Sequence, residues 1–192
     1  MTVGITFCCP CQRFLFARGK PKPCSKQTRR MALLVTFDSR EFRSTVGQFA
    51  TGVTVLSMAA PDGVHGMTAN SFTSVSLDPP LILVCVDKKN KTHHLIREIK
   101  DFAVNILSSR QEDIARLYAG QPVEAVRPEW QLDVADAPVL AGALAWLDCT
   151  LEHAYDGGDH TIYVARVKKL ASSSGDPLVF FRGRFTSLTL DA

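Results

Sequence analysis

The sequence has 192 residues, of which 46% are apolar, and its formal net charge is +3. This length suits one domain with a core of its own, and no apolar run reaches the roughly 18 residues of a membrane-spanning helix, so no membrane role is expected. The charge is uneven, because residues 1–30 carry seven Lys and Arg and no acid, whereas the remaining chain carries 15 Lys and Arg against 19 acids. The mildly acidic main part gives no indication of nucleic-acid binding.

The basic segment also holds four of the six cysteines, which are Cys8, Cys9, Cys11 and Cys24. A metal site, a targeting peptide and an extension outside the fold are the three possible interpretations. The run CCPC lacks the paired spacing of known zinc sites, and the segment lacks the apolar centre of a signal peptide. We favour a disordered or non-native extension over residues 1–32, followed by one domain over residues 33–192. Cys85 and Cys149 lie in apolar runs and are expected to be buried thiols, which indicates the cytoplasm.

The first predicted element is a helix that begins at Asp38, because an acid followed three residues later by Glu41 is typical of a helix start. Phe42, Val46 and Phe49 then form an apolar stripe, and Gly52 is expected to end the helix. A β-branched strand is predicted over residues 53–59.

A hairpin is predicted next, because the turn Pro61-Asp62-Gly63 follows that strand and a partner strand should begin near Val64. The continuous apolar run over residues 81–86 predicts a strand buried on both faces. Thr92 is expected to cap a short helix, and a further strand is predicted over residues 102–107.

A capping box over residues 109–112 predicts another helix, which ends at Gly120. The stretch 121–138 is expected to be a surface loop or short helix. Strands are then predicted over residues 145–154, 160–170, 178–181 and 184–189. Many short strands with few helices favour a mainly β barrel or sandwich over a parallel α/β sheet.

The most unusual stretch is HGMTANSFTSVSLDPP, residues 65–80, which is rich in Ser, Thr and Asn. Small hydroxyl and amide groups suit a phosphate, a ribityl chain or a flat polar ring edge, although a solvated loop or edge strand has the same composition. The turn before His160 is likewise either a functional loop or an exposed hairpin turn. His153, Asp156 and His160 lack a recognised metal-ligand spacing. No glycine-rich dinucleotide turn or P-loop is present in the sequence.

Taken in order, these segments resemble the flavin reductase-like family, the short-chain reductases of the FMN-binding split-barrel fold. The resemblance runs from about Phe37 to Leu190. Its motifs are FRSTVGQFATGVTVL, HGMTANSFTSVSLDPPLILVCV, FAVNIL, PVLAGALAWLDC, GGDHTIYVARV and PLVFFRGRF. Six such motifs in one order are specific, whereas residues 1–30 match nothing in the family.

The resemblance implies a mainly β (α+β) fold, a six-stranded antiparallel split β-barrel with flanking helices, which pairs as a homodimer. It implies FMN or FAD as the flavin and NADH or NADPH as the reductant. His160 is then the candidate residue for positioning the nicotinamide, and no metal ion is expected. Phe185 stands where the family often has Tyr, so a hydroxyl is missing there. The implied cofactor-binding residues are Thr51, Gly52, Val53, Thr54, Thr68, Ala69, Asn70, Ser71, Ser74, Val75, Ser76, Leu77, Lys91, Thr92, Gly158, Asp159, His160 and Phe185.

The activity that the resemblance implies is an NAD(P)H:flavin oxidoreductase, in which a hydride passes from nicotinamide C4 to flavin N5 and the reduced flavin serves a partner flavin-dependent monooxygenase. Two other hypotheses are a non-enzymatic flavin- or haem-binding module on the same barrel, and a redox or metal sensor that uses the N-terminal cysteines. The Gly158-Asp159-His160 turn counts against the first. Deletion of residues 1–30 tests the second, and we expect it to leave folding and reductase activity unchanged.

Overall fold

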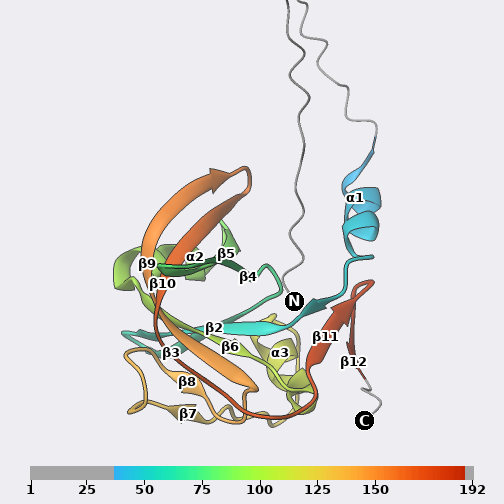
Figure 1. Cartoon of the computed structure of the whole chain (residues 1–192). Coiled ribbons are helices and arrows are strands. Elements are labelled where there is room, and N and C mark those ends of the chain that lie inside the picture. The colour runs from blue at the N-terminus through green and yellow to red at the C-terminus, as the bar shows by residue number, and fades with distance from the viewer. Residues whose placement is uncertain (1–36, 189–192) are drawn as a thin grey trace, which may run out of the picture. The chain divides into compact units, whose positions relative to one another are not determined.

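Figure 1 presents a computed structural model of the chain, which describes residues 37–188. The predictions for the N-terminal cysteines and for the domain boundary after residue 32 lie outside the described residues. None of the helices within the described range is long and apolar enough to cross a membrane.

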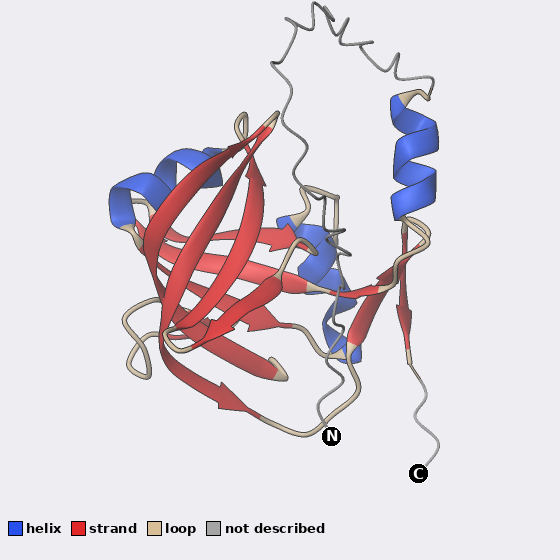
Figure 2. Ribbon diagram, turned by 45° about the horizontal axis from the view of Figure 1, so that its top comes forward, coloured by secondary structure: helices blue, strands red, loops and turns tan. Residues whose placement is uncertain are grey.

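A curled seven-stranded sheet forms most of the described part of the chain (Figures 1 and 2). Every neighbouring pair of its strands is antiparallel. The mainly β fold with an antiparallel barrel is therefore confirmed, with the small difference that this sheet has seven strands where six were expected. In sheet order the strands are β3 (Gly63–Ala69), β2 (Thr54–Ala60), β6 (Asp101–Ile106), β9 (Ala145–Gly157), β10 (His160–Ser172), β5 (Pro80–Asp87) and β4 (Thr73–Leu77).

Strands β3 and β4 follow each other in the sequence but form opposite edges of this sheet. Asn70, Ser71 and Phe72 alone connect them. Because a chain spans at most about 3.6 Å per residue, the Cα atoms of Ala69 and Thr73 lie at most about 14 Å apart. Seven flat strands spaced by about 4.8 Å would place the two edges about 29 Å apart. The sheet must therefore curl into a barrel whose two edges face each other across a seam, and residues 70–72 cross that seam.

Two small sheets and the helices complete the described part. In Figure 1, α1 and the three-stranded sheet lie to one side of the barrel, whereas α2 and α3 contact barrel strands. The three-stranded sheet contains β1 (Thr51–Gly52), β11 (Leu178–Phe181) and β12 (Arg184–Ser187), and the two-stranded sheet contains β7 (Trp130–Gln131) and β8 (Val139–Leu140). The helices are α1 (Ser39–Val46), α2 (Lys91–Ile99), the 3-10 helix η1 (Ser109–Gln111) and α3 (Glu112–Tyr118).

The first helix begins as predicted but ends earlier. The Asp38 carboxylate accepts hydrogen bonds from the backbone N–H groups of Arg40 and Glu41, both at 2.8 Å. The helix ends at Gly47 instead of Gly52. Gly52 belongs to β1, because the chain extends there to pair with β11.

The caps of the next two helices are each displaced from the predicted residue. Asn90, not Thr92, caps α2, and its side chain accepts the N–H of Thr92 at 2.9 Å. The capping box that precedes α3 pairs Ser108 with Gln111, one position earlier than predicted.

Strand β2 is buried on both faces and joins the two main hydrophobic clusters. Leu56 and Met58 belong to the core inside the barrel, together with residues of β5, β6, β10 and α2. Val55 belongs to a second cluster, in which Leu178 of β11 and Ala115 of α3 also lie. Burial of β2 on both faces therefore attaches the three-stranded sheet and α3 to the barrel.

Asn105 is a fully buried amide that connects three strands. Its Nδ2 donates to the Val55 carbonyl at 2.9 Å and to Ser57 Oγ at 2.8 Å, and its Oδ1 accepts the N–H of Leu140 at 2.8 Å. The Ser57 hydroxyl in turn donates to the Pro138 carbonyl at 2.6 Å. This side chain thus holds β2, β6 and β8 together in the buried interior.

We expect Asn105→Ala to lower the free energy of unfolding by about 2–4 kcal/mol, because it leaves buried polar partners unsatisfied. Urea denaturation followed by circular dichroism measures the change. Gln48→Ala is the matched control, because this amide is exposed and its removal should change stability by about 0.5 kcal/mol or less. Similar losses in the two variants would contradict the role given to Asn105.

Candidate functional site

Three cavities open along the seam, and the side chain of Asn70 borders all of them. Together they are called the trough. The large cavity, about 590 Å³, is lined by Met67, Thr68, Ala69, Asn70, Ser71, Cys85, Asp87, Asn90, Tyr118, Ala119, Gly120 and His160. The middle cavity, about 470 Å³, is lined by Phe49, Ala50, Thr51, Gly52, Thr54, Asn70, Phe72, Thr73, Ser74 and Ile106. The small cavity, about 180 Å³, is lined by Val53, Thr68, Ala69, Asn70, Ala119, Gln121, Phe180 and Phe185.

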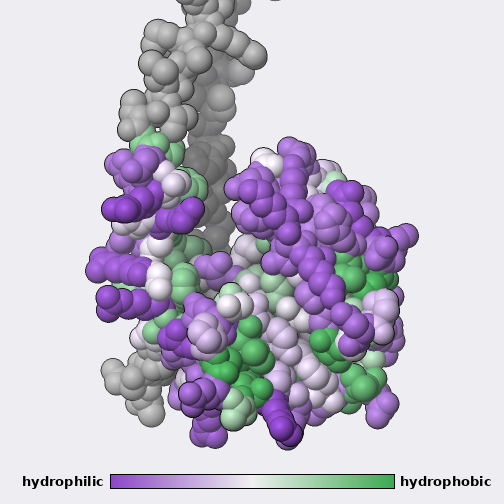
Figure 3. All heavy atoms as spheres, turned by 180° about the vertical axis from the view of Figure 1, so that it is seen from behind, coloured by the Kyte–Doolittle hydropathy of each residue, from purple (hydrophilic) through white to green (hydrophobic). Residues whose placement is uncertain are grey.

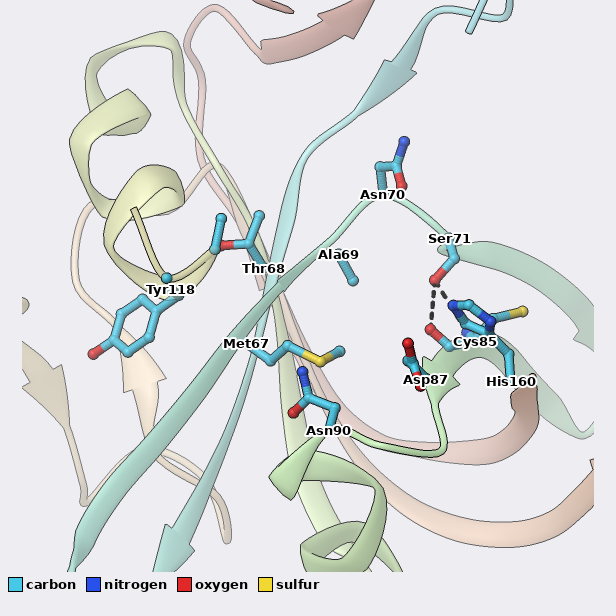
Figure 4. Close-up of a pocket in the computed structure, with 12 residues that line it drawn as sticks. Met67, Thr68, Ala69, Asn70, Ser71, Cys85, Asp87, Asn90, Tyr118 and His160 are labelled. Atoms are coloured by element: carbon cyan, nitrogen blue, oxygen red, sulfur yellow. Dashed lines mark hydrogen bonds between the residues drawn. The ribbon is translucent and has the colours of Figure 1, made fainter. Parts of the chain in front are cut away.

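Strand β5 supplies one wall of the large cavity because it is buried on one face. Ile82 and Val84 point into the barrel core, whereas Cys85 and Asp87 line the cavity. The prediction of a strand buried on both faces was therefore wrong. Figure 4 shows the large cavity between this wall and Tyr118 of α3. Burial raises the pKa of the Cys85 thiol.

Three of the predicted hydroxyls are already bonded to the protein backbone. Thr54 Oγ1 donates to the Ala69 carbonyl at 2.7 Å, and Thr68 Oγ1 donates to the Ala115 carbonyl at 2.7 Å. Ser71 Oγ donates to the Cys85 carbonyl at 3.0 Å and accepts the Cys85 N–H at 3.1 Å. These hydroxyls have used their single proton, so they hold the seam together instead of donating to a ligand.

Several polar groups without a hydrogen-bond partner among the described residues lie around the middle cavity. Thr51 Oγ1 is buried and has no hydrogen-bond partner among the described residues. The Asn70 amide and the Thr73 and Ser74 hydroxyls likewise make no hydrogen bond to the described part of the protein. Because a buried hydroxyl without a partner is costly, Thr51 Oγ1 indicates a polar partner from outside the protein beside apolar Phe49 and Phe72, whereas Asn70, Thr73 and Ser74 are exposed.

The structure brings most of the predicted cofactor-binding residues to the trough. The predicted residues that line it are Thr51, Gly52, Val53, Thr54, Thr68, Ala69, Asn70, Ser71, Ser74, His160 and Phe185. The predicted residues that do not line these three cavities are Val75, Ser76, Leu77, Lys91, Thr92, Gly158 and Asp159.

The outlying predicted residues make other contacts. Lys91 Nζ forms an exposed ion pair with Asp62 at 2.9 Å. The buried Thr92 hydroxyl lies 2.8 Å from His65 Nε2. Asp159 accepts from the His160 ring at 2.8 Å, and this contact lowers the pKa of the Asp159 carboxyl. Within the described residues, no group of three His, Cys, Asp or Glu side chains is arranged to hold a metal ion.

Sequence reasoning missed the wall that α3, the end of β5 and the turn after it provide. Asp87 is the last residue of β5 and Asn90 lies in the polar turn that follows, and this change from apolar to polar residues was a usable signal. No signal in the sequence pointed to Tyr118, because its position depends on packing against other residues. Its ring lies against the backbone of Gly66, where an added Cβ would approach the ring to 2.5 Å, and edge-to-face with Trp130 at 5.9 Å between ring centroids.

Two histidines hold α2 beside the large cavity in their neutral form. His65 lies 2.8 Å from the hydroxyl of Thr92, and His93 Nε2 lies 3.0 Å from Thr161 Oγ1. Burial lowers the pKa of both imidazoles, and the nearby charges of Lys91 and Arg97 add to this effect. The folded protein therefore binds fewer protons at these positions than the unfolded chain does.

We expect the free energy of unfolding to fall as the pH falls from about 7 to about 5, through the histidine pKa of about 6.5 in the unfolded chain. The acids with lowered pKa, such as Asp62 and Asp159, lose their contribution only at lower pH, near their unfolded value of about 4. Denaturation curves across this pH range measure the effect. The double variant His65→Gln, His93→Gln should show a flatter profile, and an unchanged slope would contradict this assignment.

Comparisons with known proteins agree with this fold. The family model described as "Flavin reductase like domain" matches residues 46–189. An NADH-dependent flavin reductase of Rhodococcus sp. is 45% identical over 153 residues, covering 77% of this chain and 85% of that protein. The reductase subunit HsaB of a flavin-dependent monooxygenase of Mycobacterium tuberculosis is 36% identical over 155 residues, covering 79% of this chain and 83% of that protein.

A solved structure shows the same fold. It is the NADH:FAD oxidoreductase SgcE6 of Streptomyces globisporus C-1027 in complex with NAD and FAD fragments. Its TM-score is 0.75 at 40% identity, and the match covers 81% of this chain and 95% of that chain. With the matched family model and the close relatives, this shared split-barrel fold shows that the chain belongs to the flavin reductase-like family.

Proposed function

We propose that this chain reduces FMN or FAD with NADH or NADPH, and that residues 33–192 form the catalytic unit. The observation that carries the proposal is the trough, in which a cavity with apolar and hydroxyl walls meets a larger polar cavity at Asn70. Two planar ligands of unequal polarity could lie in adjoining cavities and meet near this residue. The relative named an NADH-dependent flavin reductase supports this assignment.

The residues around the middle cavity fit a flavin ring. Phe49 and Phe72 offer apolar contacts to a dimethylbenzene edge, whereas Thr51, Asn70 and Ser74 offer unused polar groups to the pyrimidine edge. Gly52 leaves open space, since an added Cβ there would meet nothing within 4 Å. This donor set supports a flavin in the middle cavity more than the earlier expectation that Thr68 and Ser71 donate to it.

Transfer of a hydride from nicotinamide C4 to flavin N5 is chemistry that the two ligands supply when bound. The protein then has to hold the reacting atoms in contact and exclude water. His160, in the large cavity, would position the nicotinamide side, and Asn70 would orient both ligands from the junction. No acid or base is required for hydride transfer itself.

The reduced flavin is proposed to serve a separate flavin-dependent monooxygenase, and this is supported by the HsaB relative, which is named as the reductase subunit of such an enzyme. The cytoplasm is the proposed compartment, supported by the free thiols of Cys85 and Cys149.

Purified protein mixed with FMN or FAD should oxidise NADH or NADPH, as followed by absorbance at the nicotinamide band. Absence of oxidation with every combination would contradict the proposal, and coloured protein without turnover would favour a non-enzymatic binding module.

We expect Asn70→Leu to weaken flavin binding by about tenfold or more and to change stability by less than about 1 kcal/mol, because this exposed amide serves the trough and not the fold. Fluorescence titration and urea denaturation measure the two effects. Thr68→Val is the matched control with the opposite expectation, because its hydroxyl bonds to Ala115. It should lower stability by about 1 kcal/mol and largely keep affinity. A large loss of stability with unchanged flavin affinity in Asn70→Leu would refute the role of this residue.

We further infer that two copies of this chain pair. Helix α1 has an apolar stripe but no buried residue, and Phe42, Val46 and Phe49 are 53%, 50% and 77% exposed. Leu77 at the edge of β4 is 95% exposed. Apolar patches lie among polar side chains on the face seen in Figure 3. Exposed apolar groups of this extent are typical of a surface that a protein partner covers.

Light scattering coupled to size-exclusion chromatography should therefore give the mass of a dimer. Phe42→Glu should shift the protein toward the monomer by placing a charge in the apolar contact. Leu132→Glu, at a leucine that is 61% exposed elsewhere, should leave the mass unchanged. A monomeric parent protein would contradict the dimer.

A further inference from the structure

A second groove lies outside the trough and consists of two cavities that adjoin each other. The first, of about 370 Å³, is lined by η1 and by residues 173–176. The second, of about 300 Å³, is lined by residues of β8, β9 and β10. Gly142, Leu144 and Ser173 line both cavities, and neither cavity shares a lining residue with the trough. This second groove therefore offers a binding surface separate from the trough.

The first cavity carries one positive and one negative side chain that are not paired with each other. Arg110 and Asp176 both line it and are both exposed, and neither forms an ion pair within the described part of the chain. The hydroxyls of Ser109 and Ser174 also line it and make no hydrogen bond to the described residues. This end of the groove thus presents a cation, a carboxylate and two hydroxyls to a ligand.

The backbone that carries these charges is held in place by hydrogen bonds. Gln111 is buried, its Nε2 donates to the Ala141 carbonyl at 3.0 Å, and its Oε1 accepts the N–H of Ser108 at 3.0 Å. The N–H of Ser109 donates to the Asp176 carbonyl at 2.8 Å. These bonds join η1 to the segments on either side of the cavity, so the wall is formed before a ligand binds, as is usual for small-molecule sites.

The second cavity is apolar and contains an aromatic ring. Leu140 is buried, and Leu144 and Trp146 are half-buried. Trp146 also packs against the small hydrophobic cluster around Val139. The loop before β11 lies close to this wall, since a Cβ added at Gly175 would be 2.8 Å from Leu144 Cδ2. The charged end and the apolar end of the groove therefore meet at Leu144.

We propose that the second groove binds a small aromatic zwitterion, the class to which an α-amino acid with an aromatic side chain belongs. Its carboxylate pairs with Arg110, its ammonium group pairs with Asp176, and its ring packs on Trp146. A simple anion is attracted by Arg110 but repelled by Asp176, and a simple cation experiences the opposite, so a molecule with both charges is preferred. Adjoining cavities of this volume suit a small organic molecule.

Four probes separate the groups of such a ligand. L-phenylalanine carries both charges and the ring, phenylacetate lacks the ammonium group, phenethylamine lacks the carboxylate, and glycine lacks the ring. The chain has two tryptophans, so the indole N–H signals in the NMR spectrum of the isotope-labelled protein are few, and Trp146→Phe assigns the signal of Trp146. The shift of this signal during titration of each probe into the full-length protein measures the affinity at the groove.

We expect L-phenylalanine to bind with a Kd of about 1 mM or lower, and each of the other probes to bind at least about fivefold more weakly. Arg110→Gln should weaken L-phenylalanine binding about fivefold and strengthen phenethylamine binding, because it removes a repulsive charge. Asp176→Asn should weaken L-phenylalanine binding by a similar factor and strengthen phenylacetate binding. Arg40→Gln and Glu98→Gln, which remove exposed charges from α1 and α2, are the matched controls and should change none of the affinities.

Absence of a shift of the Trp146 signal with L-phenylalanine would overturn the inference. Equal affinities for L-phenylalanine, phenylacetate and phenethylamine would do the same, as would equal behaviour of the Arg110→Gln and Asp176→Asn variants and the two controls. Arg110→Lys keeps the positive charge and should restore the discrimination against phenethylamine, which a merely structural role of Arg110 would not. These titrations need neither flavin nor nicotinamide nucleotide, so their outcome is independent of the proposed function.

Discussion

The short connection between β3 and β4 is the constraint on which the rest of the structure depends. Three residues join the two outer strands of a seven-stranded sheet, so the sheet must close until its edges nearly meet. A seam remains because β3 and β4 are not hydrogen-bonded to each other. The trough lies along this seam. The short connection between β3 and β4 therefore accounts both for closure of the barrel and for the position of the trough.

The hydroxyl-rich stretch performs two distinct tasks at this seam. Thr68 bonds to the Ala115 carbonyl of α3 and Ser71 bonds to the Cys85 backbone of β5, so these two hydroxyls fix the chain on either side of Asn70. Asn70, between them, has no such bond among the described residues and lines all three cavities. The small polar side chains of this stretch therefore have two roles. Some of them stabilise the barrel, and Asn70 is available to bind a ligand.

Charge and shape distinguish the parts of the trough. The middle cavity offers aromatic walls and neutral donors, whereas the large cavity holds Asp87 and His160 next to each other at the ends of paired strands. Lys88 and Lys91, close to this end, form ion pairs with Asp156 and Asp62 on the surface. The electrostatic character of the site therefore depends on ion pairs that lie outside it, a relation that residue types alone do not reveal.

The sequence by itself determined the order of the strands, the turns between them and the family, because apolar periodicity, Gly and Pro turns and six ordered motifs are local properties. It also indicated that residues 65–80 carry the site. Only the tertiary structure decided that β4 pairs as a seventh strand and that the Thr68 and Ser71 hydroxyls donate to backbone carbonyls. It also decided that Tyr118 and Asp87 line the same cavity. Hydrogen-bond partners and cavity walls come from segments distant in the chain, and which of them meet is fixed by how far the sheet curls.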